Sequence, residues 1–541
     1  MSRWSAASLQ YCQGVSTRAE AATAPADGGA AGRAGREVAP LAWLGLLAGA
    51  ALISGFTILR GGAEFDEGVV LTAAARVAAG ELPYRDFLWP YGPAQPYVLG
   101  GWFELFGPSL LSWRVLRVAC DAALAVTAFA IVRREAPLPL ALVAWLVTAC
   151  VMAQPTSATP FPFALLAVLL AFYVATSDGS GAGRLVFAGV LVALAAAWRL
   201  DFALYGSLAV GAALALRPGP GGWRSLAIFG GVAAGLSLLV YLPFLIALGP
   251  ADLYDELVGT SLREKEWWTL PFPWSYDGQL RAWPPGTLAA DLKDATGYYL
   301  PLIALIGLAL ALLAWLPRAR ERWRLGGLLV LALCCVAYLL SRPDEFHTTP
   351  LLVALALTLP LCLALGAPRG IVVAVLIVLG LIGLHGLANR VSALADPPPL
   401  SVIDLPVADG AKAPPADARA LERAVSDVQR LVPPGEPIYV TTRRSDLVRF
   451  NDPRFYVLAE RPNAAALDFG LLARAEEQRE IVQALERERP QAVVRWLDPI
   501  TTVREPNLRG EPTGVRLVDE FLRREYRETA RYGDYAVLEP R

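Results

Sequence analysis

Three carboxylates stand close to an apolar stretch of the sequence: Asp66 and Glu67 come directly after it, and Asp86 follows in an aromatic and proline-rich segment. Carboxylates at a bilayer surface are costly unless they are solvated, paired or used. One use is general-base catalysis, in which a carboxylate removes the proton of an attacking hydroxyl group. Asp66, Glu67 and Asp86 are therefore the candidate catalytic residues. The alternative is helix capping, because Asp is a favoured N-cap residue and Glu stabilises the first turn of a helix.

Two charged clusters elsewhere are candidates for binding a substrate. Arg342 and His347 could hold a phosphate group, because a guanidinium forks onto phosphate oxygens. The alternative is a polar helix cap in which Arg342 pairs with Asp344. Arg199 and Asp201 also lie near the predicted bilayer, where such charges are costly unless they are paired or used. They form either a structural ion pair beside a cavity or a contact from Arg199 to a sugar phosphate.

The candidate substrate-binding residues combine cations, acids and an aromatic side chain: Arg85, Tyr91, Arg199, Asp201, Arg342, Asp344 and His347. No metal site is predicted, since His347 and His385 are the only histidines and His385 has no acidic neighbours. The cysteines show neither metal-ligand spacing nor a disulfide framework. We expect that no cofactor is required; a divalent cation is compatible with the acids but is not indicated.

The elements that position these residues are membrane-spanning helices. Of the 541 residues, 55% are hydrophobic and 18% are charged, whereas about a quarter are charged in a soluble protein. Apolar stretches of about 16–24 residues are long enough to cross a bilayer. About eleven such spans are predicted, at 41–59, 110–132, 138–154, 161–176, 185–200, 202–216, 225–248, 298–316, 326–341, 349–366 and 371–388. With a net charge of −1 the chain offers no basic patch, so nucleic acid is not an expected partner.

The arginines between the spans indicate which loops face the cytoplasm. They cluster in every second connection, at Arg133 and Arg134, Arg184, Arg217 and Arg224, Arg318 to Arg324, and Arg369. Since cytoplasmic loops carry an excess of Arg and Lys, this alternation places the amino terminus inside and the carboxyl terminus outside. Two segments allow more than one assignment. The stretch 185–216 is interrupted near Arg199 and is either one broken helix or two helices. The short stretch 94–106 is a re-entrant or interfacial segment.

The predicted organisation has four parts. Residues 1–40 form a disordered cytoplasmic tail, 41–390 a transmembrane domain with outer loops at 60–109 and 249–297, 391–414 a stiff proline-rich linker, and 415–541 a small domain outside the membrane. In the first outer loop, the apolar stripe Val69–Ala78 predicts a helix lying in the membrane interface. After the linker, strands at 438–440, 492–496 and 535–538 alternate with helices at 471–489 and 515–526, which predicts an α/β fold.

The first outer loop resembles that of the GT-C superfamily of integral-membrane glycosyltransferases, which includes the protein O-mannosyltransferases, the aminoarabinose transferases and their bacterial homologues. The resemblance rests on Phe65-Asp66-Glu67 after a first span, a short helix, then Tyr84-Arg85-Asp86-Phe87 and Trp89-Pro90-Tyr91-Gly92-Pro93. It implies that Asp66 is the catalytic carboxylate, with Glu67 beside it, and that Asp86 shapes the same pocket. The last turn replaces a His-Pro-Pro turn of the mannosyltransferases, so the resemblance does not identify the sugar or the acceptor.

The resulting expectation is an inverting glycosyltransferase at the outer face of the cytoplasmic membrane. Its donor would be a polyprenyl-phosphate sugar and its acceptor a glycan, lipid or protein of the cell envelope. Nucleotide sugars are not available outside the cell, and the sequence contains no dinucleotide or phosphate-loop fingerprint. Two other functions stay open. A transporter or lipid flippase also has many spans, although it usually shows repeats and mid-membrane charges, and a non-catalytic envelope assembly protein would use the outer domain to bind partners.

Overall fold

The computed structural model describes residues 39–61, 64–178, 181–218, 222–271, 291, 299–307, 322–344, 346–364, 369–395, 397–447, 451–467 and 474–541. The chain forms two units, Met1–Leu44 and Gly45–Arg541. The helix α1 (Pro40–Gly55) begins in the first unit, and the other elements belong to the second. The predicted tail at 1–40, except for its last two positions, and most of the predicted span at 298–316 lie outside the described residues.

Apolar helices follow one another along the second unit. They are α4 (Leu111–Arg133), α5 (Leu138–Met152), α6 (Phe161–Ala175), α7 (Ala182–Trp198), α8 (Leu200–Leu216), α9 (Gly222–Leu248), α14 (Trp323–Ser341), α15 (Thr349–Ala364) and α16 (Arg369–Ala395). Each coincides with a predicted span. Within the part of the chain that the structure describes, α4, α9 and α14 are long and apolar enough to cross a membrane, and the others are shorter but apolar. The chain is thus a multi-pass membrane protein, while the number of eleven spans stays a prediction.

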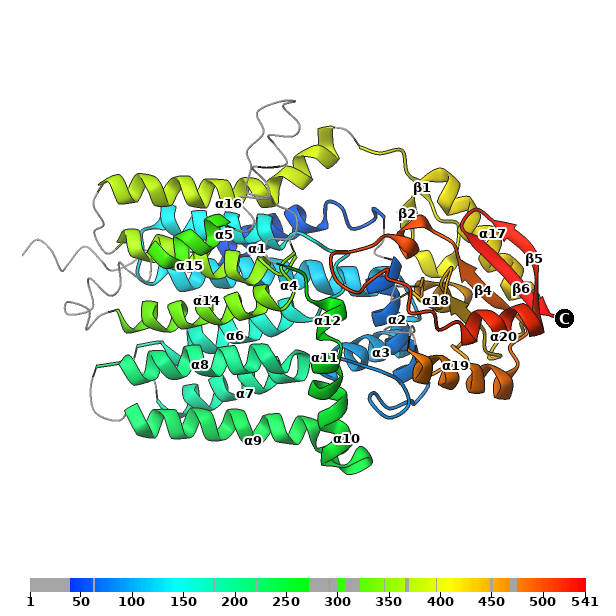
Figure 1. Cartoon of the computed structure of the whole chain (residues 1–541). Coiled ribbons are helices and arrows are strands. Elements are labelled where there is room, and N and C mark those ends of the chain that lie inside the picture. The colour runs from blue at the N-terminus through cyan, green and yellow to red at the C-terminus, as the bar shows by residue number, and fades with distance from the viewer. Residues whose placement is uncertain are drawn as a thin grey trace, which may run out of the picture. The chain divides into compact units, whose positions relative to one another are not determined.

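These helices pack side by side, with α6 against α4, α7 and α8, α14 against α8 and α15, and α5 against α4, α15 and α16 (Figure 1). Leucines such as Leu194, Leu208 and Leu238 are exposed on α7, α8 and α9, as expected for side chains that contact lipid. Between α7 and α8, Arg199 has an extended backbone with a φ of −156°. The interrupted stretch at 185–216 is therefore two helices and not one broken helix.

The connections between the helices gather at two ends. Arg324, at the start of α14, lies 2.6 Å from both Glu135 and Asp178, which belong to the connections after α4 and α6. Arg342 follows the last residue of α14 and donates a hydrogen bond of 2.6 Å to the Trp268 carbonyl. Trp268 ends α12 (Lys265–Trp268), which follows α9 together with the short helices α10 (Pro250–Tyr254) and α11 (Thr260–Arg263). Loops that the arginine pattern assigns to opposite sides of the membrane thus lie at opposite ends of α14.

The helix that carries Asp66 and Glu67 is buried. This helix, α2 (Glu64–Ala78), packs against α3 (Ala94–Phe106) and against α18 (Arg454–Ala459), which lies in the C-terminal segment. All residues from Glu67 to Ala74 are buried. The apolar stripe of α2 therefore packs against protein, whereas the position of this helix in the membrane interface stays a prediction. Asp66 and Glu67 lie in its first turn, as the sequence predicts.

The C-terminal segment, residues 397–541, contains a mixed four-stranded sheet (Figure 1). The strand order is β3 (Tyr439–Thr441), β4 (Val493–Trp496), β6 (Tyr535–Pro540) and β5 (Tyr526–Tyr532), with β3 and β4 parallel and the other pairs antiparallel. The helices of this segment include α17 (Pro415–Leu431), α19 (Ala475–Glu488) and α20 (Leu517–Glu525). The apolar faces of α19 and α20 meet the sheet in a core that includes Ile481, Leu485, Val493 and Phe521.

Most of these strands and helices lie where the sequence places them, but it predicts neither α17 nor β5. The predicted linker at 391–414 also needs correction in its second half. There β1 (Ser401–Val402) pairs with β2 (Lys412–Ala413). The backbone of Lys412 donates a hydrogen bond to the Leu59 carbonyl and accepts one from Gly61, both at 2.8 Å. This part of the chain is therefore folded against the start of the first outer loop, whereas the four domain boundaries stay predictions.

The contact between α2 and α18 requires a glycine at position 68. A Cβ atom there would lie 2.2 Å from the Arg454 backbone nitrogen and 2.9 Å from the Pro453 carbonyl carbon. We expect Gly68→Ala to push the two helices apart and to lower the free energy of unfolding by about 1–3 kcal/mol, measured by thermal unfolding. The control is Gly101→Ala on α3, where an added Cβ meets nothing within 4 Å. Equal unfolding temperatures for the two variants would contradict this close contact.

Candidate functional site

The Asp66 carboxylate is accessible yet surrounded by protein. The residue is exposed, but neighbouring protein atoms replace much of the water, and this burial raises the pKa of Asp66 above its ordinary value. The charged groups that act on it are Arg509, Asp344, Arg342 and His347. Among the residues that the structure describes, none hydrogen-bonds to this carboxylate or forms an ion pair with it. The Asp66 carboxylate is therefore accessible although protein surrounds it; Asp66 together with Arg342, Asp344, His347 and Arg509 is called the recess below.

Contacts from the C-terminal segment fix the orientation of α2. Thr72 Oγ1 donates a hydrogen bond of 2.9 Å to the Pro453 carbonyl, and Arg76 Nη1 donates one of 2.9 Å to the Ala465 carbonyl. Positions 68, 72 and 76 share one face of the helix. Asp66 is rotated away from that face, because each residue turns a helix by about 100°. The C-terminal segment thus holds one face of α2 while Asp66 points from another.

Arg342, Asp344 and His347 form a connected group after α14. The Nε of Arg342 lies 3.0 Å from Oδ2 of Asp344, and Nδ1 of His347 lies 2.6 Å from its Oδ1. The backbone N–H of His347 donates to the same Oδ1 at 2.9 Å. Burial raises the pKa of Asp344, but its hydrogen bonds with His347 and the nearby cations hold that pKa below the ordinary value. The polar cap considered from the sequence is present, and its three side chains act on Asp66.

A loop between β4 and α20 adds a second arginine to this group. Nη2 of Arg342 lies 3.1 Å from Oε2 of Glu505, and Nη1 of Arg509 lies 3.1 Å from Oε1 of the same carboxylate. Among the charged groups that act on Asp66, Arg509 has the largest effect. The sequence does not single out Glu505 or Arg509. They lie in an irregular loop without a motif, so nothing in the local pattern connects them to the first outer loop.

The predicted pairing of Arg199 with Asp201 is present. Nε and Nη2 of Arg199 donate hydrogen bonds of 2.9 and 2.8 Å to the two carboxylate oxygens of Asp201. The guanidinium also lies 5.2 Å from the ring centroid of Tyr91 and 5.0 Å from that of Tyr338. At these distances the aromatic faces attract the cation. The ion pair is therefore held in an aromatic surround.

Tyr91 and Tyr338 connect the Arg199–Asp201 ion pair to Asp66 and His347. Burial raises the pKa of Tyr91, and the charges of both Arg199 and Asp66 act on it. The ring of Tyr338, on α14, lies 4.8 Å from the ring of His347. The structure thus brings Asp66 together with Tyr91, Arg199, Asp201, Arg342, Asp344 and His347, which come from distant parts of the sequence.

Glu67 does not share this recess. It is completely buried, and its two carboxylate oxygens accept hydrogen bonds of 2.6 and 2.7 Å from Arg114 on α4. Arg114 also donates to the carbonyls of Ile58 and Gly61, at 2.7 Å each. A carboxylate engaged in this way cannot take the proton of a substrate. The structure gives Glu67 a structural role in place of the catalytic role that the sequence suggests.

Asp86 and Arg85 also make only local side-chain contacts. Oδ2 of Asp86 accepts a hydrogen bond of 2.8 Å from the backbone N–H of Leu82, and both carboxylate oxygens accept from Arg85 at 2.8–2.9 Å. The hydrogen bond from Arg85 lowers the pKa of Asp86 below its ordinary value. The pair closes the turn before Phe87. The role of Asp86 as a second catalytic acid and that of Arg85 as a substrate contact stay predictions.

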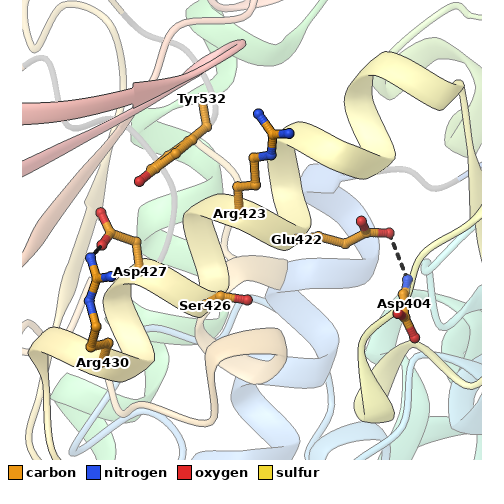
Figure 2. A pocket seen from close by; sticks show the side chains of 7 residues that line it. All are labelled: Asp404, Glu422, Arg423, Ser426, Asp427, Arg430 and Tyr532. Atoms are coloured by element: carbon orange, nitrogen blue, oxygen red, sulfur yellow. Dashed lines mark hydrogen bonds and ion pairs between the residues drawn. The ribbon is translucent and has the colours of Figure 1, made fainter.

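Two other kinds of site can be compared with this recess. Among the described residues, no three or more His, Cys, Asp or Glu side chains are grouped to hold a metal ion. A surface pocket beside α17 is lined by Asp404, Glu422, Arg423, Ser426, Asp427, Arg430 and Tyr532 (Figure 2). Several of its polar groups contact one another: Arg430 forms an ion pair with Asp427, and the backbone N–H of Asp404 donates a hydrogen bond to Glu422. The pocket contains none of the candidate residues.

Comparison with known proteins identifies the fold. No family model matches the chain, and no curated protein matches it. Among solved structures, the chain is similar to ArnT from Cupriavidus metallidurans bound to undecaprenyl phosphate. The TM-score is 0.53 at 14% identity, covering 92% of this chain and 98% of ArnT. The chain shares the fold of ArnT.

A weaker similarity is found to the Archaeoglobus fulgidus oligosaccharyltransferase tethered with an acceptor peptide. Here the TM-score is 0.49 at 12% identity, covering 85% of this chain and 69% of that protein. The ArnT similarity confirms, for the fold, the GT-C resemblance that the first outer loop indicates in the sequence. This similarity shows the fold and does not identify the reaction.

Proposed function

We propose that the protein is an inverting membrane glycosyltransferase with Asp66 as its general base. It would transfer a sugar from a polyprenyl-phosphate donor to a hydroxyl group of a cell-envelope glycan, lipid or protein. The observation that carries this proposal is the available Asp66 carboxylate beside Arg342, Arg509 and His347. A general base must be accessible to the substrate, and a phosphate leaving group needs cations to stabilise its charge. The recess supplies both.

In the proposed reaction, Asp66 accepts the proton of the acceptor hydroxyl while that oxygen attacks the anomeric carbon of the donor sugar. The bond from this carbon to the phosphate oxygen breaks, and its electron pair leaves with the polyprenyl phosphate. Cations of the recess stabilise the charge that develops on the phosphate. A single displacement inverts the configuration at the anomeric carbon. Because side chains supply the positive charge, we expect this step to require no cofactor.

The similarity to a protein whose structure contains a bound lipid phosphate supports the donor class. ArnT, whose fold this chain shares, has a structure with bound undecaprenyl phosphate. A polyprenyl-phosphate sugar contains the same phosphate group and apolar chain. Its phosphate would enter the recess beside Arg342, while the apolar helices around the recess offer a surface for its tail.

We further infer that the recess opens to the outer face of the cytoplasmic membrane. The arginine-rich connections, including the one before Arg324, lie at the opposite end of α14 from Arg342. An excess of arginine favours the cytoplasmic side for those connections. In this orientation the amino terminus is inside, and the C-terminal segment and Asp66 are outside.

The transfer reaction can be tested with purified protein in lipid nanodiscs. We expect label from at least one member of a panel of polyprenyl-phosphate sugars to enter an acceptor in a cell-envelope extract. Nucleotide sugars serve as the control and should give no product. Substrate counterflow in sealed vesicles without any product would contradict the enzyme and favour a transporter.

A further inference from the structure

The loop between β4 and α20 exposes apolar side chains. Ile500, Val503 and Leu508 are 46%, 54% and 36% exposed. In the rest of the C-terminal segment, as far as the structure describes it, Val402 is the only large apolar side chain with comparable exposure. Single exposed apolar residues are common on protein surfaces, whereas several of them together indicate a surface that a partner or a membrane covers. This loop therefore has an interaction surface.

Polar contacts hold the loop at the end of a membrane helix. The Glu505 carboxylate accepts hydrogen bonds of 3.1 Å from Arg342, which directly follows α14. The Asn507 amide donates a hydrogen bond of 3.3 Å to the carbonyl of Thr269, the residue after α12. Figure 1 shows this loop, in orange, reaching from the sheet to the ends of the membrane helices. Because α14 is long and apolar enough to cross a membrane, its end marks the level at which the bilayer meets water, and the loop lies at that level.

An exposed apolar face of α14 continues to this end. Leu333, Ala337 and Leu340 are exposed, and their spacing puts them on one face of the helix. In a membrane-spanning helix, such a face contacts lipid. Leu340 lies two residues before Arg342. The end of α14 therefore lies at the lipid-facing perimeter of the helices, and so does the loop that Arg342 contacts.

We propose that Ile500, Val503 and Leu508 insert into the lipid leaflet beside the end of α14. The partner of this loop is thus the bilayer surface. Apolar side chains of interfacial segments bury themselves about 5–10 Å into the boundary between headgroups and acyl chains. The inference is independent of the proposed sugar transfer and of which side of the membrane faces the cytoplasm, because it uses only the position of the loop at the end of a span.

A lipid surface fits this position better than a protein partner does. A protein that covered the same side chains would have to displace lipid from the neighbouring face of α14. Arg504 stands in the middle of the loop and is exposed, with its guanidinium 3.2 Å from Glu511. An arginine in such a place lays its apolar stem along lipid and keeps its charge among the headgroups.

The same loop contributes to the recess from its buried side. Arg509 is buried and lies 4.8 Å from the ring of Trp268, whereas its neighbour Leu508 is exposed. Lipid would therefore contact one side of a loop whose other side belongs to the recess. The bilayer would help to hold the C-terminal segment at a fixed height above the helices.

The test attaches the environment-sensitive fluorophore NBD to Val503→Cys in the full-length protein, in phosphatidylcholine nanodiscs. The control site is Arg527→Cys, on the exposed part of β5, and the unsubstituted protein gives the blank for native cysteines. We expect phosphatidylcholine with a nitroxide near the start of its acyl chain to quench the label at 503 at least about two-fold more than the label at 527, because the nitroxide reaches only groups in that boundary region. Iodide dissolved in the water should quench the two labels in the opposite order.

A second variant excludes insertion caused by the label alone. With the label at Leu508→Cys, an added Val503→Asp should lower quenching by the nitroxide lipid about two-fold or more, because a carboxylate is costly within the bilayer boundary. Val503→Leu keeps an apolar side chain and should leave the quenching unchanged. Both changes are at an exposed position, so the unfolding temperatures should stay equal.

Three outcomes would overturn the inference. Equal quenching of the labels at 503 and 527 by both reagents would place the loop in water. Protection of the label at 503 from iodide without quenching by the nitroxide lipid would show that protein covers the loop. Unchanged quenching in Val503→Asp would show that the apolar side chain does not hold the loop in lipid. None of these measurements uses sugar transfer, so they leave the proposed function to its own test.

Discussion

Asp66→Asn should lower the turnover of sugar transfer at least about 100-fold, because a positioned general base contributes on that order or more. Asn has nearly the same shape as Asp but cannot accept the proton of an acceptor hydroxyl. The carboxylate makes no hydrogen bond or ion pair with the described residues, so the variant should fold normally. We expect the unfolding temperature and the KM for the donor to change little. Initial rates with the active donor at saturation measure the effect.

Two comparisons show whether Asp66 acts as the base. Glu64→Gln changes an acid of the same helical turn that faces Arg454 at 3.5 Å, and it should keep most of the activity. The wild-type rate should fall as the pH drops through the pKa of Asp66, since only the ionised carboxylate accepts a proton. Burial raises this pKa above the ordinary 3.8, against the charges of Arg509, Arg342 and His347, while Asp344 raises it further. Near-native turnover in Asp66→Asn would remove Asp66 from the mechanism.

The sequence predicts the helices well because the membrane leaves a strong pattern. A span must be apolar over most of its length, so α4, α9 and α14 are visible as uninterrupted apolar stretches. The alternating arginines also indicate which loops lie on each side of the membrane. The position of Asp66 at the start of a helix is predictable for a similar reason, since the residue follows a span and the helix has a recognisable stop at Gly80. These signals are all local in the sequence.

The different roles of Asp66 and Glu67 are not predictable from their adjacent positions. In a helix, neighbouring residues point about 100° apart. Glu67 therefore turns toward Arg114 on α4, while Asp66 turns toward the recess. Only the packing of α2 decides which acid meets a buried arginine and which stays accessible.

The contribution of the C-terminal segment is also hidden from the sequence. Arg509 lies in an irregular loop, and its importance depends on the docking of α18 against α2 at Gly68 and on the contact of Arg509 with Trp268. These contacts join residues separated by hundreds of positions, and neither periodicity nor turn residues report them. The same segment holds α2 and supplies the charge with the largest effect on Asp66. A role restricted to docking envelope partners does not account for this arrangement.

The second large effect concerns stability. We expect Glu67→Gln to lower the free energy of unfolding by about 3–5 kcal/mol, because removing one partner of a buried ion pair leaves an uncompensated charge. Arg114 and Glu67 are both 0% exposed and form two hydrogen bonds of 2.6 and 2.7 Å. The loss should appear as a lower unfolding temperature of the purified protein. Any loss of transfer should follow the loss of folded protein.

A matched ion pair at the surface isolates the effect of burial. Glu528 accepts hydrogen bonds of 2.8 and 2.9 Å from Arg531, so the geometry is the same, but these side chains are 44% and 57% exposed. Glu528→Gln should therefore cost less than about 1 kcal/mol. A catalytic Glu67 would give the reverse result, in which Glu67→Gln unfolds like the wild type and yet loses turnover. The unfolding temperature and the turnover of the same Glu67→Gln preparation thus decide between the two roles, since water and salt screen the surface pair but cannot reach the buried one.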